Sequence, residues 1–580
     1  MRQYLYKATT LIASLILCFH SILQAQNAQE VFQAAGTPGN PKVQISFNRY
    51  YTPDGLEALA RKITDAYPNL VKLSSIGKSA KGRELWMLSV TNYKKGIADR
   101  KPGFYVDGNI HSNEIQGAEI GIYTAWYLTE MYGKNDFITE LLDDRIFYIV
   151  PTINPDARDH YMKEANSANS PRAGLIPLDD DLDGLFDEDG FDDLDGDGSI
   201  TSMRRKSANG NYIIDPKDPR RMIEINPDDV VTAERYELLG GEGIDNDGDG
   251  RVNEDRKGYY DPNRDWGWNW QPDYIQRGAY KYPFSVPENR AVADFIKAHP
   301  NVAGAQSYHN SGGMILRGPG ASEDKDTYNR ADVRVYDAIG KKGEQLIPGY
   351  RYLTVFEDLY SVFGGELDWF YGGRGIYTFS NEIFTSFAYY KNKERDRNQT
   401  YDFDKDLIFG DAFTNWKEYN HPTYGLIEIG GFKKNFGRAT PGFLLEEECH
   451  RNMAFTLYHA WHMPKLSISD VTEKSIGNGL TEVTATIRNE RLIPTHASQD
   501  LKYKIERPDY VMLSGANILA SMIVDNDDFG VTTEQQTKTP EKIRVDNIPG
   551  DSYVKVRWIV KDKKKIKITV DSAKGGIVSR

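Results

Sequence analysis

The chain has 580 residues, too many for one compact domain, and its length predicts two or three. Its 12% aromatic and 27% charged residues are typical of a folded protein and exclude wholesale disorder. The net charge is −13, but sixteen acidic residues lie within 179–197 and 245–255, and the remainder carries about +3, which excludes nucleic acid as a partner.

The N-terminus predicts a signal peptide over residues 1–25. A basic start precedes an apolar segment over 10–23 that is short for a membrane span, and the small residue Ala25 follows it. We therefore expect a secreted or periplasmic protein; the alternative is an uncleaved anchor. Residues 26–47 are expected to form a flexible lead-in. The mature chain would retain only Cys449, so an intramolecular disulfide is excluded.

Residues 48–464 predict an α/β domain. Thr52 and Pro53 are typical of a helix start. Helical patterns then alternate with strand-like segments, which predicts a sheet between helix layers. Ligand sites in such sheets collect at the carboxyl ends of strands. The strand-like segments are 85–91, 103–108, 145–152, 302–309 and 376–384.

The chain from residue 465 to 580 has a different pattern. Short segments of alternating polar and apolar residues replace the helical periodicity, which predicts an all-β sandwich. We see no candidate catalytic residues in it.

The segment D-G-N-I-H-S-N-E (107–114) places His111 and Glu114 three residues apart after a predicted strand. Such a pair can supply two zinc ligands, and His309, at the end of another predicted strand, can supply the third. Taken alone, the spacing of the pair favours a capped helix start with a solvated histidine over a metal site. Partners elsewhere in the chain have to decide between these interpretations.

Several motifs supply such partners. In chain order they are Y-P-N-L-V-K-L-S-S-I-G-K-S-A-K-G-R-E-L (67–85), N-I-H-S-N-E (109–114), N-P-D-A-R (154–158), M-R-R-K (203–206), D-P-N-R-D-W (261–266), S-Y-H-N (307–310), L-Y-S-V-F-G-G-E-L-D-W (359–369) and F-S-N-E-I (379–383). With these motifs in this order, residues 48–464 resemble the M14 zinc metallocarboxypeptidases of the carboxypeptidase A type. The resemblance implies a mixed-sheet α/β/α fold and removal of C-terminal residues from peptides that have a free C-terminus.

The resemblance also implies roles for individual residues. His111, Glu114 and His309 would bind one Zn²⁺, and Glu382 would be the base that assists the metal-activated water. Arg204 would face the developing oxyanion. The substrate's terminal carboxylate would be held by Asn263 and Arg264, Tyr360 would close over the substrate, and Leu367 would line the side-chain pocket.

Two departures from the family pattern concern this site. The zinc motif has Ser-Asn where the digestive enzymes have an arginine that grips longer substrates, which puts extended subsite contacts in doubt. Glu428, in Y-G-L-I-E-I-G-G-F (424–432), rivals Glu382 as the base. Motif spacing favours Glu382 and leaves Glu428 a packing or hydrogen-bonding role at a strand end. Because Leu367 is apolar, we expect apolar or neutral C-terminal residues in the substrate.

Acidic inserts at 179–201 and 245–256 contain an internal repeat, D-x-D-x-D-G, followed in two copies by a Glu-Asp pair. The pattern is similar to the first half of an EF-hand calcium loop, although its twelfth position holds arginine in two copies. Calcium would order the loops that present the substrate-binding arginines; the alternative is a solvated acidic loop. The candidate Ca²⁺ ligands are Asp179, Asp181, Asp183, Glu188, Asp193, Asp195, Asp197, Asp245, Asp247, Asp249 and Glu254.

The sequence thus predicts an exported zinc carboxypeptidase with peptide substrates and possible Ca²⁺ sites. Two alternatives stay open: the same site acting on cell-wall peptides or another amide, and a non-catalytic, calcium-dependent surface-binding protein.

Overall fold

The computed structural model describes residues 34–179, 182–226, 229–258, 260–391 and 398–580. The predicted signal peptide and Asp181 lie outside these ranges. The chain divides into two compact units, residues 1–44 and 45–580. Residues 34–44 consist of turns and extended backbone. No helix in the described part of the chain is long and apolar enough to cross a membrane.

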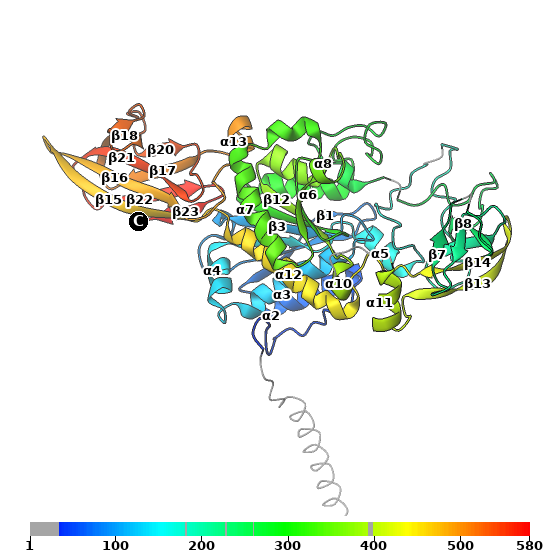
Figure 1. Ribbon diagram of the computed structural model, residues 1–580. Helices are drawn as coiled ribbons and strands as arrows, with labels where there is room; N and C mark the ends of the chain where they lie inside the picture. Colours follow the sequence, from blue (N-terminus) through cyan, green and yellow to red (C-terminus); the bar gives the residue numbers. More distant parts are fainter. Residues whose placement is uncertain (1–33, 180–181, 227–228, 259, 392–397) are drawn as a thin grey trace, which may run out of the picture. The chain divides into compact units, whose positions relative to one another are not determined.

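The second unit is built on an eight-stranded mixed sheet (Figure 1). The central strands run parallel to one another, antiparallel pairs join the strands on either side of them, and the last pair at one edge is again parallel. The predicted mixed α/β sheet is therefore confirmed. In spatial order the strands are β1 (Val71–Lys78), β2 (Glu84–Val90), β4 (Ile146–Val150), β3 (Gly103–Gly108), β9 (Val302–Asn310), β12 (Tyr377–Ile383), β10 (Met314–Arg317) and β11 (Arg351–Thr354).

Helices cover both faces of this sheet. Successive side chains of a strand point to opposite faces: Tyr105 stacks on Phe370 and lies near Phe295, whereas Phe104 packs against His459. The long helices are α2 (Pro53–Ala66), α3 (Gln116–Met131), α4 (Asp136–Asp144), α5 (Pro155–Lys163), α6 (Pro287–Ala298), α7 (Arg330–Leu346), α11 (Gln399–Leu407) and α12 (Gly442–Trp461). Short turns are α8 (Val355–Asp358), α9 (Glu366–Asp368), α10 (Phe387–Tyr390), η1 (Ala98–Arg100), η2 (Pro262–Arg264), η3 (Ser322–Thr327) and η4 (Trp369–Gly373).

Helix α3 brings the zinc motif onto the sheet. All of its residues are buried, because it contacts β3 and β9 on one side and α2 and α12 on others. Gly117, in its first turn, permits this close approach: a Cβ there would lie 2.7 Å from the Cβ of Tyr308. The following motif, N-P-D-A-R, anchors the same helix through an ion pair of 2.7 Å between the buried side chains of Arg158 and Glu119.

A second sheet, of six strands, was not predicted. It joins strands from the region 202–241 to a hairpin at 413–432, so it combines segments from two distant parts of the sequence (Figure 1). In spatial order its strands are β13 (Phe413–His421), β14 (Gly425–Phe432), β5 (Ser202–Lys206), β8 (Arg235–Gly241), β6 (Tyr212–Ile214) and β7 (Met222–Glu224).

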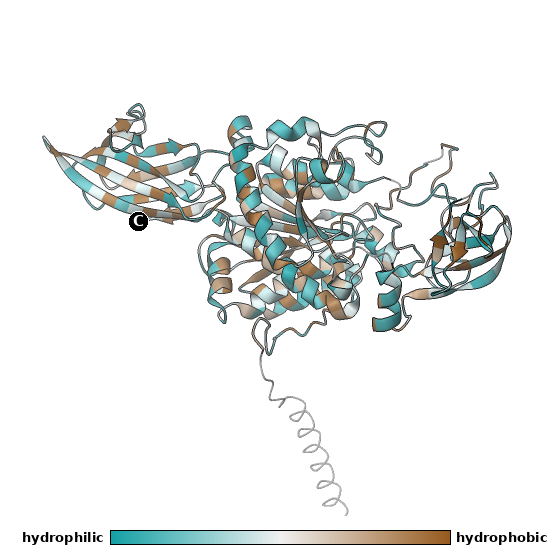
Figure 2. Ribbon diagram, viewed as in Figure 1, coloured by the Kyte–Doolittle hydropathy of each residue, from teal (hydrophilic) through white to brown (hydrophobic). Residues whose placement is uncertain are grey.

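The C-terminal region is a β-sandwich, as predicted. Its two sheets enclose a core that includes Val483, Val511 and Trp558, and Figure 2 shows the alternation of polar and apolar residues along its strands. One sheet has β15 (Leu466–Gly477), β16 (Leu480–Asn489), β21 (Ser552–Lys561), β18 (Asn517–Asn526) and β19 (Val531–Thr532); the other has β20 (Lys542–Val545), β17 (Asp509–Ser514), β22 (Lys567–Ser572) and β23 (Gly576–Ser579).

Polar contacts join the sandwich to the α/β domain. The ammonium group of Lys574 is buried and donates to the carbonyl of Gly375 at 2.9 Å. Arg374 forms an ion pair with Glu506. At the start of α13 (Ser498–Tyr503), the N–H of Ser498 donates to Asp332 at 2.7 Å.

His496, buried beside this interface, is expected to make stability depend on pH. Burial lowers its pKa, but the hydrogen bond to Asp500 at 2.9 Å and the carboxylate of Asp509, 3.4 Å away, outweigh burial and raise the pKa to about 9. The stabilisation is therefore complete below the unfolded-state pKa of about 6.5 and is lost as pH rises through 9. Its size is about 2–3 kcal/mol.

Thermal unfolding of the wild type and His496→Gln at pH 6.5 and 9.5 measures this effect. We expect the two proteins to differ at pH 6.5 and to converge at pH 9.5. A difference in Tm that is the same at both pH values would contradict the assignment.

Candidate active site

Three side chains meet at the carboxyl ends of β3 and β9. The Nδ1 atoms of His111 and His309 lie 3.1 Å apart, and the Oε2 atom of Glu114 lies 3.0 Å from the first and 2.9 Å from the second. All three side chains are buried. Burial opposes ionisation of Glu114, but the two histidines hold its pKa well below the usual range. The predicted zinc ligands are therefore brought together.

Asp261 orients this group, and sequence reasoning missed it. Its Oδ1 atom lies 2.9 Å from Nε2 of His111, which leaves Nδ1 of that ring directed toward the other two ligands. Burial opposes its ionisation, but Arg264, Arg172 and His111 hold the pKa of Asp261 well below its ordinary value. The available signal was the aspartate that begins D-P-N-R.

This donor set fits a zinc ion. Two imidazole nitrogens and one carboxylate oxygen converge, and a carboxylate behind one imidazole is the arrangement commonly found around zinc ligands in proteins. Three protein ligands leave a coordination position for water or substrate.

Glu382 lies beside the three ligands. It is directly opposite His309 in the parallel pairing of β12 with β9. Burial raises the pKa of its carboxyl group to about 7, and the negative charge of Glu114 contributes to the rise. A carboxylate poised near neutral pH is suited to take up and release a proton.

Asn263 and Arg264 lie on η2, next to the same group. The Nδ2 atom of Asn263 is 3.5 Å from Nε2 of His309, and its Oδ1 atom accepts from the N–H of Glu366 at 2.9 Å. Arg264 is nearly buried, and its Nη2 atom lies 3.7 Å from Asp261.

The other two predicted substrate-binding residues lie on the chain that follows α8. Tyr360 is 57% exposed, so its ring is free to be approached from solvent. Leu367 is half-buried and packs against the apolar cluster of Leu316, Val355 and Val362. Its surroundings are therefore apolar, as its side chain suggests.

Arg204 is not where the sequence predicted it. It lies on β5 of the six-stranded sheet, where its Nε atom donates to Glu428 at 2.6 Å. Its guanidinium also lies over the rings of Tyr236 and Trp416. Among the described residues none of these partners belongs to the zinc-ligand group. The prediction is corrected: M-R-R-K is a strand of the second sheet, and Glu428 is the ion-pair partner of Arg204.

Arg172, rather than Arg204, lies beside the zinc-ligand group. Its Nη1 atom contacts Asp261, and its Nε atom lies 3.6 Å from Oε1 of Glu114. Hydrogen bonds from the Ser-Asn pair of the zinc motif fix the segment that carries Arg172. The backbone N–H of Ser112 donates to the carbonyl of Arg172 at 2.9 Å, and the side-chain amide of Asn113 donates to the carbonyl of Ala168 at 3.1 Å.

Comparison with known families decides what this group of residues belongs to. A family profile described as zinc carboxypeptidase (Peptidase_M14) matches residues 56–188 and 222–391, more than half of the chain. The chain belongs to the zinc carboxypeptidase family. A second profile, a domain of unknown function (DUF8731), matches residues 465–580 of this zinc carboxypeptidase family member.

Individual relatives match shorter parts of it. Carboxypeptidase D of Drosophila melanogaster is 30% identical over 146 residues, 24% of this chain and 10% of the relative. Carboxypeptidase M of Mus musculus is 35% identical over 115 residues, 20% of this chain and 26% of the relative. The matched regions thus span only about a tenth and a quarter of these two relatives.

Solved structures were also compared. Thrombin activatable fibrinolysis inhibitor has a TM-score of 0.41 and 17% identity, with 72% of this chain and 75% of that chain covered. Carboxypeptidase A from Helicoverpa armigera has a TM-score of 0.39 and 18% identity, with 69% and 77% covered.

The acidic inserts of this zinc carboxypeptidase family member share one turn geometry. In each copy of the repeat the first aspartate accepts a hydrogen bond from the N–H of the glycine five residues later. The three pairs are Asp179 with Gly184 at 3.1 Å, Asp193 with Gly198 at 2.9 Å and Asp245 with Gly250 at 3.0 Å.

The first and last copies close on each other. A β-bridge pairs Asp189 with Asp255, and Glu188 and Glu254 lie beside them. Both carboxylate oxygens of each glutamate are shielded from solvent and, among the described residues, lack a hydrogen-bond partner. Burial raises the pKa of both glutamates to about 7, Asp255 adding to the rise at Glu188 and Asp189 at Glu254.

Among the described residues, the carboxylates in and beside these inserts gather in four groups. One includes Glu242, a buried residue after β8 that sequence reasoning missed because no part of the repeat contains it. Asp197 instead accepts from the N–H of Ser199 and the hydroxyl of Thr414. The groups are Asp183–Glu188–Asp247, Asp189–Asp247–Glu254, Asp193–Asp195–Glu242 and Asp245–Asp247–Asp249.

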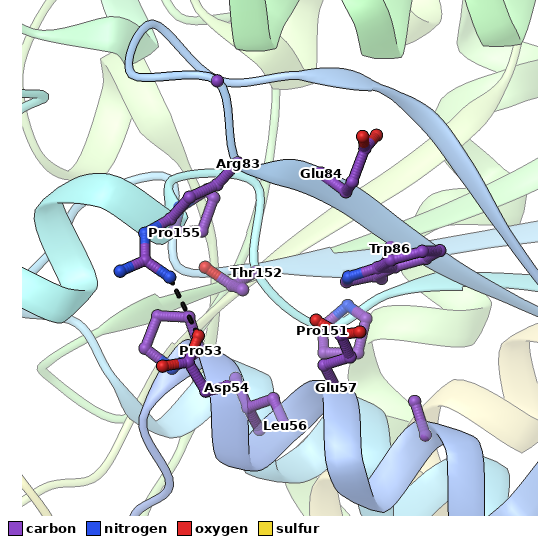
Figure 3. A pocket seen from close by; sticks show the side chains of 12 residues that line it. Pro53, Asp54, Leu56, Glu57, Arg83, Glu84, Trp86, Pro151, Thr152 and Pro155 are labelled. Carbon is purple, nitrogen blue, oxygen red and sulfur yellow. Dashed lines mark hydrogen bonds and ion pairs between the residues drawn. The ribbon is translucent and has the colours of Figure 1, made fainter.

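A separate cavity of about 270 Å³ lies between α2 and β2 (Figure 3). None of the predicted site residues lines it. Its charged groups pair with one another or with neighbours: Arg83 with Asp54 at 2.9 Å and Glu57 with Arg61 at 2.7 Å. Because these charges are already paired, the cavity offers little for recognition of a ligand.

Proposed function

We propose that this protein is an exported zinc-dependent carboxypeptidase that hydrolyses the C-terminal peptide bond of peptides. One observation carries the proposal: the three ligand side chains, Glu382 and the Asn263–Arg264 pair lie together at one edge of the sheet. A site that holds a cation, a base and a receptor for a carboxylate has the parts this reaction needs. Export rests on the predicted signal peptide.

Binding and orientation fall to Arg264 and Asn263. A planar guanidinium holds a carboxylate through two hydrogen bonds, and the amide donates beside it. This fixes the last peptide bond of the substrate over His111, Glu114 and His309, which would hold the zinc ion. When bound, zinc polarises the scissile carbonyl and acidifies water.

Proton transfer and charge stabilisation fall to two further residues. Glu382 takes a proton from the attacking water and delivers it to the leaving amine. Arg172 supplies positive charge where the carbonyl oxygen becomes negative. Asp261 keeps the His111 ring in one tautomer, with its Nε2 protonated. Tyr360 closes over the substrate, and the apolar surroundings of Leu367 favour apolar or neutral C-terminal residues.

Mass spectrometry of a mixed peptide pool, in free-acid and amidated forms, tests the proposal with zinc-loaded mature protein. Loss of single C-terminal residues from the free acids alone is expected. Cleavage of neither form with zinc bound would favour a non-peptide amide or a binding protein instead.

We also propose that the acidic inserts bind Ca²⁺. The desolvated carboxylates of Glu188 and Glu254, left without hydrogen-bond donors, support this, because such groups are costly unless a cation offsets them. The further ligands would come from Asp179, Asp181, Asp183, Asp193, Asp195, Asp197, Asp245, Asp247, Asp249 and Glu242.

Removal of Ca²⁺ with Zn²⁺ retained is therefore expected to raise KM and lower Tm. Arg172 precedes the first insert and Asp261 follows the second, so loosening the inserts loosens both residues. Ligand binding at 100 times Kd stabilises by about 2.7 kcal/mol. Steady-state kinetics and thermal unfolding at a fixed Zn²⁺ concentration measure the effect. An unchanged KM and Tm would contradict the calcium proposal.

A further inference from the structure

Arg438 approaches the carboxylate of Glu114 from an unexpected part of the chain. It lies on the segment that joins β14 of the second sheet to α12. Its Nη2 atom is 3.3 Å from Oε1 of Glu114 and also donates to the carbonyl of Asn310. Its Nη1 atom donates to Oδ1 of Asn169 at 3.2 Å.

The backbone at Arg438 is fixed against the ends of two elements that carry the metal ligands. Its backbone carbonyl accepts hydrogen bonds from two side-chain amides. These are Asn310 at 3.0 Å and Gln116, at the start of α3, at 3.3 Å. The N–H of Thr440 donates to Oε1 of Gln116 at 3.0 Å. The position of Arg438 is therefore built into the fold.

Two guanidinium groups share one oxygen of a predicted metal ligand. Arg172 and Arg438 both contact Oε1 of Glu114. Positive charge on a ligand carboxylate opposes binding of a cation, so the arrangement is costly unless the arginines have another role. Among the described residues the buried Nε–H of Arg438 has no acceptor, and the side chain is 25% exposed. The unpaired Nε–H is shielded from solvent, so the exposed quarter of the side chain is the part that a group arriving from outside would meet.

The contacts of the two arginines show which part of a substrate each would meet. Arg172 contacts Asp261, beside the Asn263–Arg264 pair. The side chain of Arg438 instead contacts Asn169, Asn310 and Glu114, none of which belongs to residues 261–264. A peptide whose terminal carboxylate lies on Arg264 and whose last bond lies over the ligands would extend its preceding residues toward Arg438.

We propose that Arg438 binds main-chain carbonyl oxygens on the N-terminal side of the scissile bond and so favours longer peptides. This inference rests on the proposed carboxypeptidase function. It gives the second sheet a role in the site: the hairpin β13–β14 leads into the segment that carries this side chain.

The experiment compares a free dipeptide, which has no carbonyl on that side, with an N-acetylated tetrapeptide that ends in the same dipeptide. Arg438→Met is expected to lower kcat/KM for the tetrapeptide by roughly 10- to 100-fold, the worth of a hydrogen bond from a charged donor, and to leave that for the dipeptide nearly unchanged. Zinc affinity, measured by chelator competition, should change little. Lys433→Met is the matched control, because its ammonium group donates to the carbonyl of Asp411 instead.

An equal loss for both substrates, with or without weakened zinc binding, would show that Arg438 acts only through Glu114 and would overturn the inference, as would no loss at all. If Arg438→Met fails to fold, Arg438→Lys takes its place, because lysine keeps the positive charge but lacks the paired N–H donors of the guanidinium. A loss of kcat/KM for the tetrapeptide but not for the dipeptide would again support the inference. A wild type that cleaves neither substrate would overturn the proposed function and this inference with it.

Discussion

Replacement of Glu382 by Gln is expected to lower kcat by roughly 10²- to 10⁴-fold with little change in KM. Gln has the same shape but cannot accept the proton of the attacking water. Steady-state kinetics with a tetrapeptide substrate measure the effect, and the zinc content of the variant shows that the neighbouring ligand group is intact.

Glu428→Gln is the matched control, since this was the rival base. Its carboxylate pairs with the buried guanidinium of Arg204 at 2.6 Å. Its loss should cost about 1–3 kcal/mol of stability and leave kcat within about twofold. An active Glu382→Gln variant beside an inactive Glu428→Gln variant would reverse the assignment of the base.

Replacement of Arg264 by Ala is expected to remove recognition of the substrate's carboxylate. Binding is best measured with Glu382→Gln as the parent, because that protein should hold a peptide without cleaving it. Calorimetry with a peptide acid and its amide should show that the parent binds the acid at least about 30-fold more tightly, since a nearly buried charged pair is worth about 2–5 kcal/mol. Arg264→Ala should abolish that preference.

The amide serves as the internal control in this comparison. Arg264 also lies near Asp261, and a general disturbance of the site would weaken both ligands alike. Equal weakening of acid and amide would therefore contradict the assigned role, whereas a loss confined to the acid supports it.

The central sheet could be predicted because its signals are local. The predicted strands at 103–108 and 302–309 begin with apolar segments, G-F-Y-V and V-A-G-A, and are buried along their whole length on both faces, which is typical of parallel strands. The convergence of His111, Glu114 and His309 followed from the rule that ligands collect at the carboxyl ends of such strands. Asp261 could also have been predicted, because it begins the D-P-N-R motif that supplied Asn263 and Arg264.

The places of Arg172, Arg204 and Arg438, unlike that of Arg264, could not be predicted, because they depend on pairings between distant segments. Arg204 contacts Glu428, 224 residues later, because their strands pair in a sheet that no local sequence pattern predicts. Arg172 follows an unremarkable Asn-Ser-Pro and reaches the site because Ser112 binds its backbone carbonyl. Arg438 likewise depends on where the hairpin β13–β14 ends.

The attachment of the β-sandwich restricts how this protein can be shortened or recombined. Asp332 accepts from Ser498 of the sandwich and also from the hydroxyls of Tyr371 and Tyr377, and the latter residue begins the strand that carries Glu382. A chain cut after residue 464 would leave these groups exposed at the cut face and would lose the buried Lys574. The domain of unknown function therefore cannot be exchanged freely between proteins. Any exchange has to preserve the contacting residues on both sides of its interface with the α/β domain.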